Sequence, residues 1–139
     1  MIAGLIQDHE YWHQKIKPSI DNQQVTYIGN CGPKERDTVL GNALALLHPI
    51  NFDEPFGLSV AESMCAGTPV IAYNRGAMPE LIVDAKTGFL VSNVESAVAA
   101  VKKLRSIDRR SCRRHVETNF SQDKMIEDYL KVYQQILFH

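Results

Sequence analysis

The chain has 139 residues, of which 45% are hydrophobic and 22% are charged, and its formal net charge is −1. This length suits one domain with its own hydrophobic core, and this composition excludes an intrinsically disordered protein. The balanced charge excludes nucleic acid as a partner held by bulk positive charge. The longest apolar run, residues 43–47 with their flanks, is far short of the ~20 residues that cross a bilayer. We therefore expect a soluble, cytoplasmic protein.

Cysteine and histidine give no metal signature. Cys31, Cys65 and Cys112 are far apart and lack the close pairs that zinc sites and redox motifs use. We expect reduced thiols in the core or at the surface. His9 and His13 are four residues apart and could share a helix face, but no third ligand lies near them in the sequence. The sequence therefore predicts neither a metal nor a cofactor.

Short apolar runs rich in β-branched residues alternate along the chain with longer amphipathic segments, which is typical of βαβ units. Five strands are predicted, at residues 2–5, 25–28, 43–47, 70–73 and 88–91. The third of them is a continuous apolar run and is expected to be buried on both faces. These strands and the helices between them predict an α/β fold with a doubly wound parallel sheet.

Three helices are predicted between the first four strands. The first begins near His9 and is stopped with the help of Pro18. The second spans residues 34–42. The third begins near Leu58 and ends at Gly67, with a proline just beyond.

A short helix is predicted at residues 80–82, before the last strand. After that strand, Ser92 and Glu95 have the spacing of a capping box. An apolar stripe at helical spacing follows, made of Val94, Ala97, Val98, Val101 and Leu104.

A long terminal helix is predicted after Ser121, the expected N-cap, with Asp123 in its first turn. Its apolar stripe comprises Met125, Ile126, Tyr129, Leu130, Tyr133, Ile136 and Leu137. Two interpretations of this stripe stay open. Either it packs wholly within this domain, or part of it is covered by a neighbouring domain.

The N-terminus does not fit a complete sheet. A parallel α/β sheet normally begins with a full strand, whereas residues 2–5 follow Met1 where a longer apolar run is expected. We interpret residues 1–139 as one domain whose first strand and loop are incomplete, and the chain as a fragment of a longer protein.

The richest junction between a strand and a helix is residues 51–62. Ligands of open parallel sheets sit beyond the carboxyl ends of the strands, where a helix N-terminus attracts phosphate. Gly57 allows close approach of an anion, and the amides of Gly57 and Leu58 open the helix. Glu54 and Glu62 can flank one bound molecule and accept hydrogen bonds from its hydroxyls. This combination indicates a nucleotide-sugar, although a solvated glutamate pair and a plain turn have the same pattern.

Residues 54–72 read Glu-Pro-Phe-Gly-Leu-Ser-Val-Ala-Glu-Ser-Met-Cys-Ala-Gly-Thr-Pro-Val-Ile-Ala. This segment resembles the E-x7-E signature of the group 1 (family 4) retaining glycosyltransferases, which have the GT-B fold. Residues 74–82 and 87–91 resemble the next segments of that family, and residues from 120 onward resemble its C-terminal helix. The resemblance covers nearly the whole chain. It implies a Rossmann-like, donor-binding C-terminal domain.

The resemblance also implies a role for each matching residue. Glu62 would hold the ribose hydroxyls of the donor. Glu54 would contact the donor sugar and act as the catalytic carboxylate that stabilises charge at the anomeric carbon. Ile28 occupies the place where the family contacts the nucleobase. The segment of Pro55, Phe56, Gly57 and Leu58 would cradle the distal phosphate and the sugar through its backbone amides. Gly76 and Glu80 match positions that back this donor loop.

The chain departs from the family pattern at its start. The family usually carries an Arg and a Lys on the first strand and loop of this domain, where they neutralise the diphosphate. This chain begins after that stretch. Lys34 is a minor basic substitute at best, because a lysine on a short surface helix is usually solvated. The N-terminal acceptor-binding domain is missing as well.

The implied reaction transfers a sugar from a UDP-, GDP- or ADP-linked donor to an acceptor hydroxyl with retention and without a metal. The isolated chain is expected to be inactive, and any membrane contact would come through the missing domain, peripherally. A stand-alone nucleotide-sugar-binding module and a fragment of a nucleotide-sugar epimerase are the alternatives. A dinucleotide oxidoreductase fits worse, because no G-x-G-x-x-G follows any strand.

Overall fold

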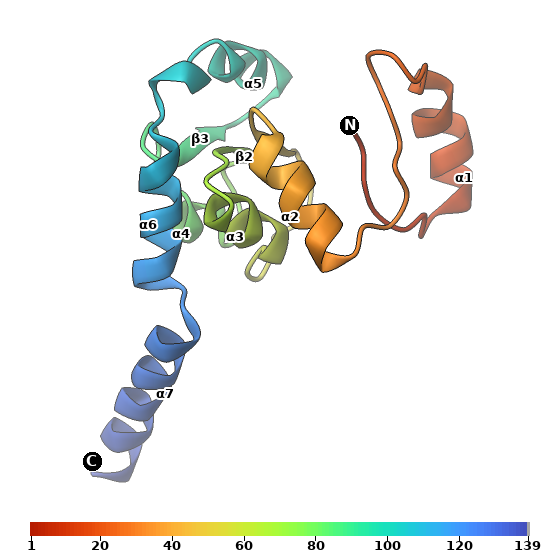
Figure 1. Cartoon of the computed structure of the whole chain (residues 1–139). Coiled ribbons are helices and arrows are strands. Elements are labelled where there is room, and N and C mark those ends of the chain that lie inside the picture. The colour runs from red at the N-terminus through yellow and green to blue at the C-terminus, as the bar shows by residue number, and fades with distance from the viewer. Residues whose placement is uncertain (139) are drawn as a thin grey trace. The chain divides into compact units, whose positions relative to one another are not determined.

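The computed structural model describes residues 1–138, which divide into two compact units. Unit 1 comprises Met1–Thr38, and unit 2 begins at Val39. Figure 1 shows the order of the elements along the chain. The two units are described one at a time.

Unit 1 is built around a short run of helical turns. These are α1 (His9–Tyr11), a π-helical turn (Trp12–Ile16) and a 3-10 turn (Lys17–Ser19). The side chain of Asp8 caps α1 by accepting a hydrogen bond from the Tyr11 amide at 2.8 Å. Pro18 lies in the 3-10 turn, and the next residue after that turn is extended. The predicted helix and its end near Pro18 are therefore confirmed.

The two strands predicted in unit 1 are reduced to one isolated parallel bridge, between Ile2 and Tyr27. Ile2 donates to the Thr26 carbonyl at 2.7 Å, and the Tyr27 hydroxyl donates to the Gly4 carbonyl at 2.7 Å. The Trp12 ring lies 4.5 Å from the Tyr27 ring, centroid to centroid. Two short strands without a larger sheet have little independent stability, which accounts for the loss of regular strands.

Helix α2 (Pro33–Asn42) leads from unit 1 into unit 2, close to the predicted bounds. Unit 2 holds a parallel sheet in the order β1 (Leu46–His48), β2 (Val70–Tyr73) and β3 (Gly88–Val91). Leu46 pairs with Val70, and Val70 pairs with Gly88. The parallel sheet with its helices confirms the α/β fold.

The third predicted strand is only partly correct. It starts at Leu46 rather than at residue 43, and it was expected to be buried on both faces. Leu44 and Leu47 are instead 62% and 61% exposed. Leu44 lies before β1, and β1 is an edge strand of the sheet in unit 2, so fewer side chains surround it than surround the central strand β2.

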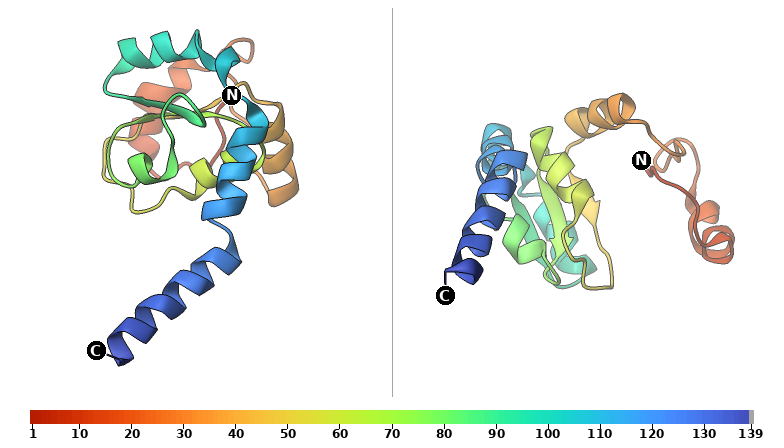
Figure 2. Two further views of the ribbon diagram at one scale, coloured as in Figure 1. Left: turned by 90° about the vertical axis from the view of Figure 1, so that its left-hand side faces the viewer. Right: turned by 90° about the horizontal axis from the view of Figure 1, so that it is seen from below.

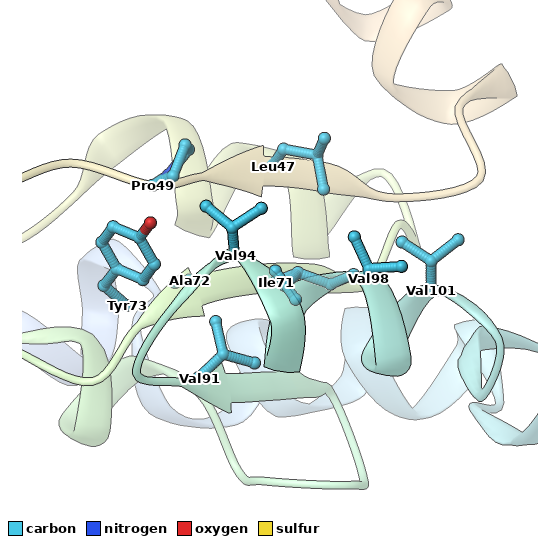
Figure 3. Close-up of a pocket in the computed structure, with 10 residues that line it drawn as sticks. Leu47, Pro49, Ile71, Ala72, Tyr73, Val91, Val94, Val98 and Val101 are labelled. Carbon is cyan, nitrogen blue, oxygen red and sulfur yellow. The ribbon is translucent and has the colours of Figure 1, made fainter.

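The helices of unit 2 lie on both faces of the sheet. Helix α3 (Leu58–Cys65) packs against α6 (Arg109–Asn119), and α5 (Val94–Val101) packs on β2 and β3. Figure 3 shows α5 in front of the sheet and α6 behind it. The short α4 (Met78–Leu81) and a 3-10 turn (Leu104–Ser106) complete the connections. The core between the sheet and α3 includes Val60, Met64, Val70, Met78 and Leu81.

Two local features differ from the sequence prediction. The capping box of α5 uses Asn93 and Ser96, not Ser92 and Glu95, and the Asn93 side chain accepts from the Ser96 amide at 2.8 Å. The extended backbone at Asn93 is the geometry that an N-cap needs. Helix α6 was not predicted, because its dominant residues are charged and only Cys112 and Val116 are buried.

Arg109, at the start of α6, ties three segments of unit 2 together. Its guanidinium donates to the Ala43 and Gly41 carbonyls at 2.7 Å each and to the Thr68 hydroxyl at 2.6 Å. The Thr68 hydroxyl in turn donates to the Leu40 carbonyl at 2.6 Å. This network closes the end of α2 that lies in unit 2 against the start of β2.

Helix α7 (Gln122–Leu137) is the predicted long terminal helix, and Ser121 caps it by accepting from the Lys124 amide at 3.3 Å. None of its residues is buried. The apolar stripe is exposed from Ile126, at 45%, to Leu137, at 76%. In the left view of Figure 2, α7 runs away from the sheet. The interpretation that this stripe packs wholly within the domain is therefore wrong. Within residues 1–138, no helix has the length and apolar character needed to span a membrane.

Candidate functional site

The loop between β1 and α3 lies at the carboxyl end of the sheet, where open α/β folds bind ligands. It contains the predicted site residues Glu54 to Gly57, whereas Leu58 and Glu62 lie in α3 and Ile28 lies in unit 1. Ile28 is half-buried, and its amide donates to the Ile2 carbonyl at 3.0 Å. The other predicted positions all belong to unit 2.

Gly57 is the N-cap of α3 and has a left-handed backbone, with φ +97°. A Cβ there would lie 2.7 Å from Met78 Cε and 3.3 Å from Leu81 Cδ1, so both conformation and space require glycine. No side chain caps this helix. The amides of Gly57 and Leu58 precede its first intrahelical bonds, which the Gly57 carbonyl accepts from Val60 and Ala61. The N-terminus of α3 therefore presents backbone donors toward the loop.

Glu54 is half-buried beside Gly57, where a Cβ would lie 3.6 Å from Glu54 Cγ. Its carbonyl accepts from the Ala77 amide at 2.9 Å. Gly76, with φ +53°, lies directly behind it: a Cβ there would be 2.5 Å from the Glu54 nitrogen. Arg75 pairs with Asp53 at 3.2 Å. The turn after β2 thus fixes the backbone of Glu54, as expected for Gly76.

Glu62 is the fifth residue of α3 and is half-buried. At ~1.5 Å of rise per residue, it lies roughly 6 Å along the helix from Leu58. The structure therefore holds Glu54 at the opening of α3 and Glu62 about one turn further on. Glu80, the other position matched to the family, is exposed on α4.

The other predicted positions, at the end of the loop and the first residue of α3, form an apolar rim. Pro55, Phe56 and Leu58 are exposed, the last of them by 70%. The Phe56 ring meets the Phe120 ring edge to face, with centroids 6.0 Å apart. A pocket continues from this rim to Tyr129 in α7. The sequence did not indicate this neighbour, because Phe120 lies far along the chain between two helices.

His48 is a residue of this region that the sequence analysis did not single out. It ends β1, and its Nε2 atom is buried with no hydrogen-bond partner among the described residues. Burial lowers the pKa of His48 below its ordinary value of 6.5, and the negative charge of Glu54 opposes this shift. Burial therefore favours the neutral form of this imidazole. The only signal for it in the sequence is its position at the end of a predicted strand.

A polar hollow was also missed. It is lined at the carboxyl ends of all three strands of unit 2 by Asn51, Asn74, Arg75, Ser92 and Asn93, among others. Each of these residues comes within three positions of a strand's end. That placement is the signal that could have found them.

The structure offers little for metal binding. Over residues 1–138, no three His, Cys, Asp or Glu side chains are grouped closely enough to hold a metal ion. Cys31, Cys65 and Cys112 are free thiols, and burial raises the pKa of Cys112 to about 11. Its Sγ atom donates to the Thr87 carbonyl at 3.6 Å, which makes Cys112 a core residue.

Comparison with protein families gives a match over residues 1–122 to the family described as "Glycosyl transferases group 1". Among curated relatives, the chain is 32% identical over 121 residues to an uncharacterised 41.2 kDa protein in the cps region of Klebsiella pneumoniae, covering 82% of this chain and 33% of that protein. It is 32% identical over 138 residues to a trehalose synthase of Rubrobacter xylanophilus, covering 92% of this chain and 32% of that enzyme. The chain thus spans about a third of each relative.

Solved structures agree on the fold. A glycosyltransferase from Rickettsia africae superposes with a TM-score of 0.78 at 25% identity, over 97% of this chain and 39% of that one. The HepE protein of Anabaena, solved in complex with UDP-glucose, gives a TM-score of 0.72 at 19% identity. It covers 91% of this chain and 36% of its own.

Proposed function

Because the chain belongs to the group 1 glycosyltransferases, we propose that it is the donor-binding part of such an enzyme and binds a nucleoside-diphosphate sugar. The complex of the HepE protein with UDP-glucose supports a nucleotide-sugar as the ligand class. In the whole enzyme, the sugar would be transferred to an acceptor hydroxyl with retention at its anomeric carbon. The bond between that carbon and the diphosphate would break, and the nucleoside diphosphate would leave.

Each predicted residue receives a role in this proposal. Glu62, one turn into α3, accepts hydrogen bonds from the ribose hydroxyls. Glu54 faces the donor sugar and stabilises positive charge at its anomeric carbon. Ile28 offers an apolar contact to the nucleobase. In the segment Pro55 to Leu58, the backbone amides of Phe56, Gly57 and Leu58 hold the distal phosphate, since proline has no N–H.

The opening of α3 at Gly57 is the observation that carries the proposal. It combines an uncapped helix N-terminus, a glycine that both φ and packing require, and a glutamate directly beside it. A helix N-terminus attracts phosphate through its free amides and its dipole. The adjacent Glu54 is repelled by a bare phosphate and is suited to hydroxyl groups. A phosphorylated sugar carries both a phosphate and hydroxyl groups, so it suits the helix N-terminus and Glu54 together.

The exposed stripe of α7 supports the proposal that another domain of the whole enzyme covers this helix. A stand-alone binding module would bury this stripe, whereas Tyr129 and Leu130 are 57% and 53% exposed. We assign the stripe to the neighbouring acceptor-binding domain of the whole enzyme. Without that domain, the chain alone has no transferase activity and binds its nucleotide weakly.

The test is saturation-transfer NMR of the purified chain with UDP, GDP and ADP and with their glucose or mannose conjugates. We expect saturation of the base and ribose protons of one nucleotide. Glu62→Ala should abolish the ribose signal, and Gly57→Ala should weaken the whole spectrum because alanine is strained at φ +97°.

Glu127→Ala, at an exposed glutamate of α7, is the matched control and should bind as the unaltered chain does. Undiminished binding by Glu62→Ala would contradict the assigned site. Turnover of a donor sugar by the isolated chain would contradict the proposed dependence on a second domain.

A further inference from the structure

A hollow of about 270 Å³ lies in unit 2 between α6 and the turn of residues 82–87, which joins α4 to β3. Figure 1 shows α4 beside α6. The lining of the hollow includes two cations and several side chains with hydrogen-bonding groups: Lys86, Thr87, Ser111, Arg114, His115 and Thr118. None of its described lining residues is an aspartate or a glutamate. This composition favours an anionic ligand.

The hollow is separate from the candidate functional site. The turn that carries Lys86 precedes β3, whereas the loop that carries Glu54 follows β1. Because the three strands are parallel, these two segments lie at opposite edges of the sheet. The roles proposed for the Glu54 loop therefore do not account for this hollow.

Lys86 and Arg114 are the two cations of the hollow, and they come from different segments of the chain. Both side chains are exposed, and neither forms an ion pair with any of residues 1–138. By contrast, the adjacent Arg113 pairs with Glu117 at 2.7 Å and does not line the hollow. The positive charges of Lys86 and Arg114 are thus left to meet an anion from outside the chain.

Positive charge is concentrated around the start of α6. Residues 102–114 contain seven Lys or Arg and one Asp, whereas the whole chain has a net charge of −1. The one acid, Asp108, accepts hydrogen bonds from the Ser111 hydroxyl at 2.9 Å and from the Arg110 amide at 3.0 Å, and it does not line the hollow. A surface with one predominant sign of charge raises the local concentration of oppositely charged ligands.

Two contacts hold the walls of the hollow together. The Nε2 atom of His115, in α6, donates to the Leu81 carbonyl at the end of α4 at 2.9 Å. The Sγ atom of Cys112 donates to the Thr87 carbonyl, next to Lys86 in the turn, at 3.6 Å. The two walls are therefore joined before a ligand arrives, so that binding requires little ordering of the backbone.

The charge and the size of the hollow favour a phosphate group among the possible anions. At pH 7 a phosphate monoester carries about two negative charges and three strong acceptor oxygens. It can accept charge-assisted hydrogen bonds from two cations at once, and the Thr118 hydroxyl is a further donor within the hollow. Pockets for larger ligands usually measure about 300–1,000 Å³, so this hollow suits one small phosphate group rather than a whole nucleotide.

We propose that the hollow between Lys86 and Arg114 is a second binding site of this chain and takes the phosphate group of a small phosphate ester. Lys86 and Arg114 bind the phosphate oxygens, and Thr118 donates to one of them. The proposal does not depend on the ligand of the Glu54 loop.

The test is NMR titration of the ¹⁵N-labelled full chain with inorganic phosphate at pH 7.5 and constant ionic strength. We expect saturable shifts of the Lys86, Arg114 and Thr118 amides. Shifts of the Gly57 and Leu58 amides would report the opening of α3, so the two sites are distinguished. Glycerol 3-phosphate should shift the same signals of the hollow as inorganic phosphate.

The double variant Lys86→Ala, Arg114→Ala should weaken phosphate binding at the hollow at least tenfold. Its matched control is Lys102→Ala, Arg113→Ala, which removes the same charge at two exposed residues outside the hollow and should change binding less than twofold. The amide spectra of both double variants should retain the dispersion of the unaltered chain, since all four side chains are exposed. Equal weakening in the two double variants would overturn the proposal, because it would assign the effect to net charge alone.

A second arm identifies the source of the phosphate. Vesicles of phosphatidylcholine with and without phosphatidic acid are sedimented with the chain. Sedimentation that requires phosphatidic acid, Lys86 and Arg114 would support the site with a lipid headgroup as its ligand, whereas binding of the soluble phosphates alone would support it with a soluble ester. Binding of neither, or phosphate shifts that do not saturate, would overturn the proposal.

Discussion

Helices α6 and α7 follow one another in the chain, yet α6 buries apolar residues whereas α7 buries none. Helix α6 is dominated by charged residues, but its Cys112 and Val116 are buried, at 0% and 8% exposure. Helix α7 is much richer in Leu, Ile and Tyr, and none of its residues is buried. The difference teaches that the apolar content of a helix does not decide its burial. What decides it is the surface placed against the helix: α3 lies against α6, and within unit 2 no such cover lies over α7.

The largest expected effect on stability concerns the buried packing of α6 against α3. Met64 is fully buried in α3, the helix on which α6 packs. Met64→Ala should lower the free energy of unfolding by roughly 2–5 kcal/mol, through lost burial and the cavity left behind. Urea unfolding followed by circular dichroism measures it. Met125→Ala, in the exposed stripe of α7, is the matched control; an equal loss there would show that α7 is covered after all.

Arg109 tests how α6 is held at its start. Arg109→Ala removes three hydrogen bonds from a charged donor, to the Gly41 and Ala43 carbonyls and to the Thr68 hydroxyl. We expect a loss of about 1.5–3 kcal/mol in the free energy of unfolding. The neighbouring Arg110→Ala serves as control, because Arg110 is exposed. If the two variants are equally stable, the network adds nothing to the docking of α6.

His48 contrasts with Arg109, because its buried Nε2 atom has no hydrogen-bond partner among the described residues. Its pKa is lower in the folded chain than the ordinary 6.5, so the unfolded chain takes up the proton first as the pH falls. The contribution of neutral His48 to stability is thus complete above pH 6.5 and is lost as the pH drops through the folded-state pKa. In the unaltered chain, the urea concentration at the midpoint of unfolding should therefore fall between pH 7.5 and pH 5.

His48→Leu should flatten that decline, whereas His9→Leu, at an exposed histidine of unit 1, should leave it unchanged. A decline of the same steepness in His48→Leu would assign the pH dependence to other groups. The comparison is made at constant ionic strength, so that screening of surface charges does not add to the difference.

The smallest expected effect lies on α7. Leu130→Ser combined with Ile136→Ser should change the free energy of unfolding by no more than about 0.5 kcal/mol per site, because both side chains are more than half exposed. The same substitution at the buried Val116 of α6 should cost several times more. Self-association of the chain at high concentration, followed by light scattering, should decrease in the α7 variant. A large loss of stability in that variant would indicate that α7 packs on unit 2 in solution.

The strongest sequence signals were those with a local physical cause. Gly67 and the proline after it ended α3 as predicted, and Ser121 capped α7, because caps and breakers act on adjacent backbone groups. The strands at β2 and β3 were predicted at their observed bounds. The pattern of residues 54–62 located the loop and helix of the candidate site. Their proposed roles remain predictions.

Other features could not be predicted because they depend on distant segments. Helix α6 has few apolar residues, and its burial comes from α3 and from contacts of Arg109 with residues more than 40 positions away. The capping box moved to Asn93 and Ser96 because the end of β3 sets the backbone at that point. The orphaned Nε2 of His48 likewise depends on what surrounds the end of β1.

The sequence by itself determined the α/β class, the glycine-opened helix with its two glutamates, and the apolar stripe of α7, since periodicity, caps and glycine conformations are properties of neighbouring residues. The tertiary structure alone decided which apolar surfaces are covered. It left the 43–47 run at an open edge and the α7 stripe in solvent, because burial requires a partner surface, and a partner surface is not encoded in the segment that it covers.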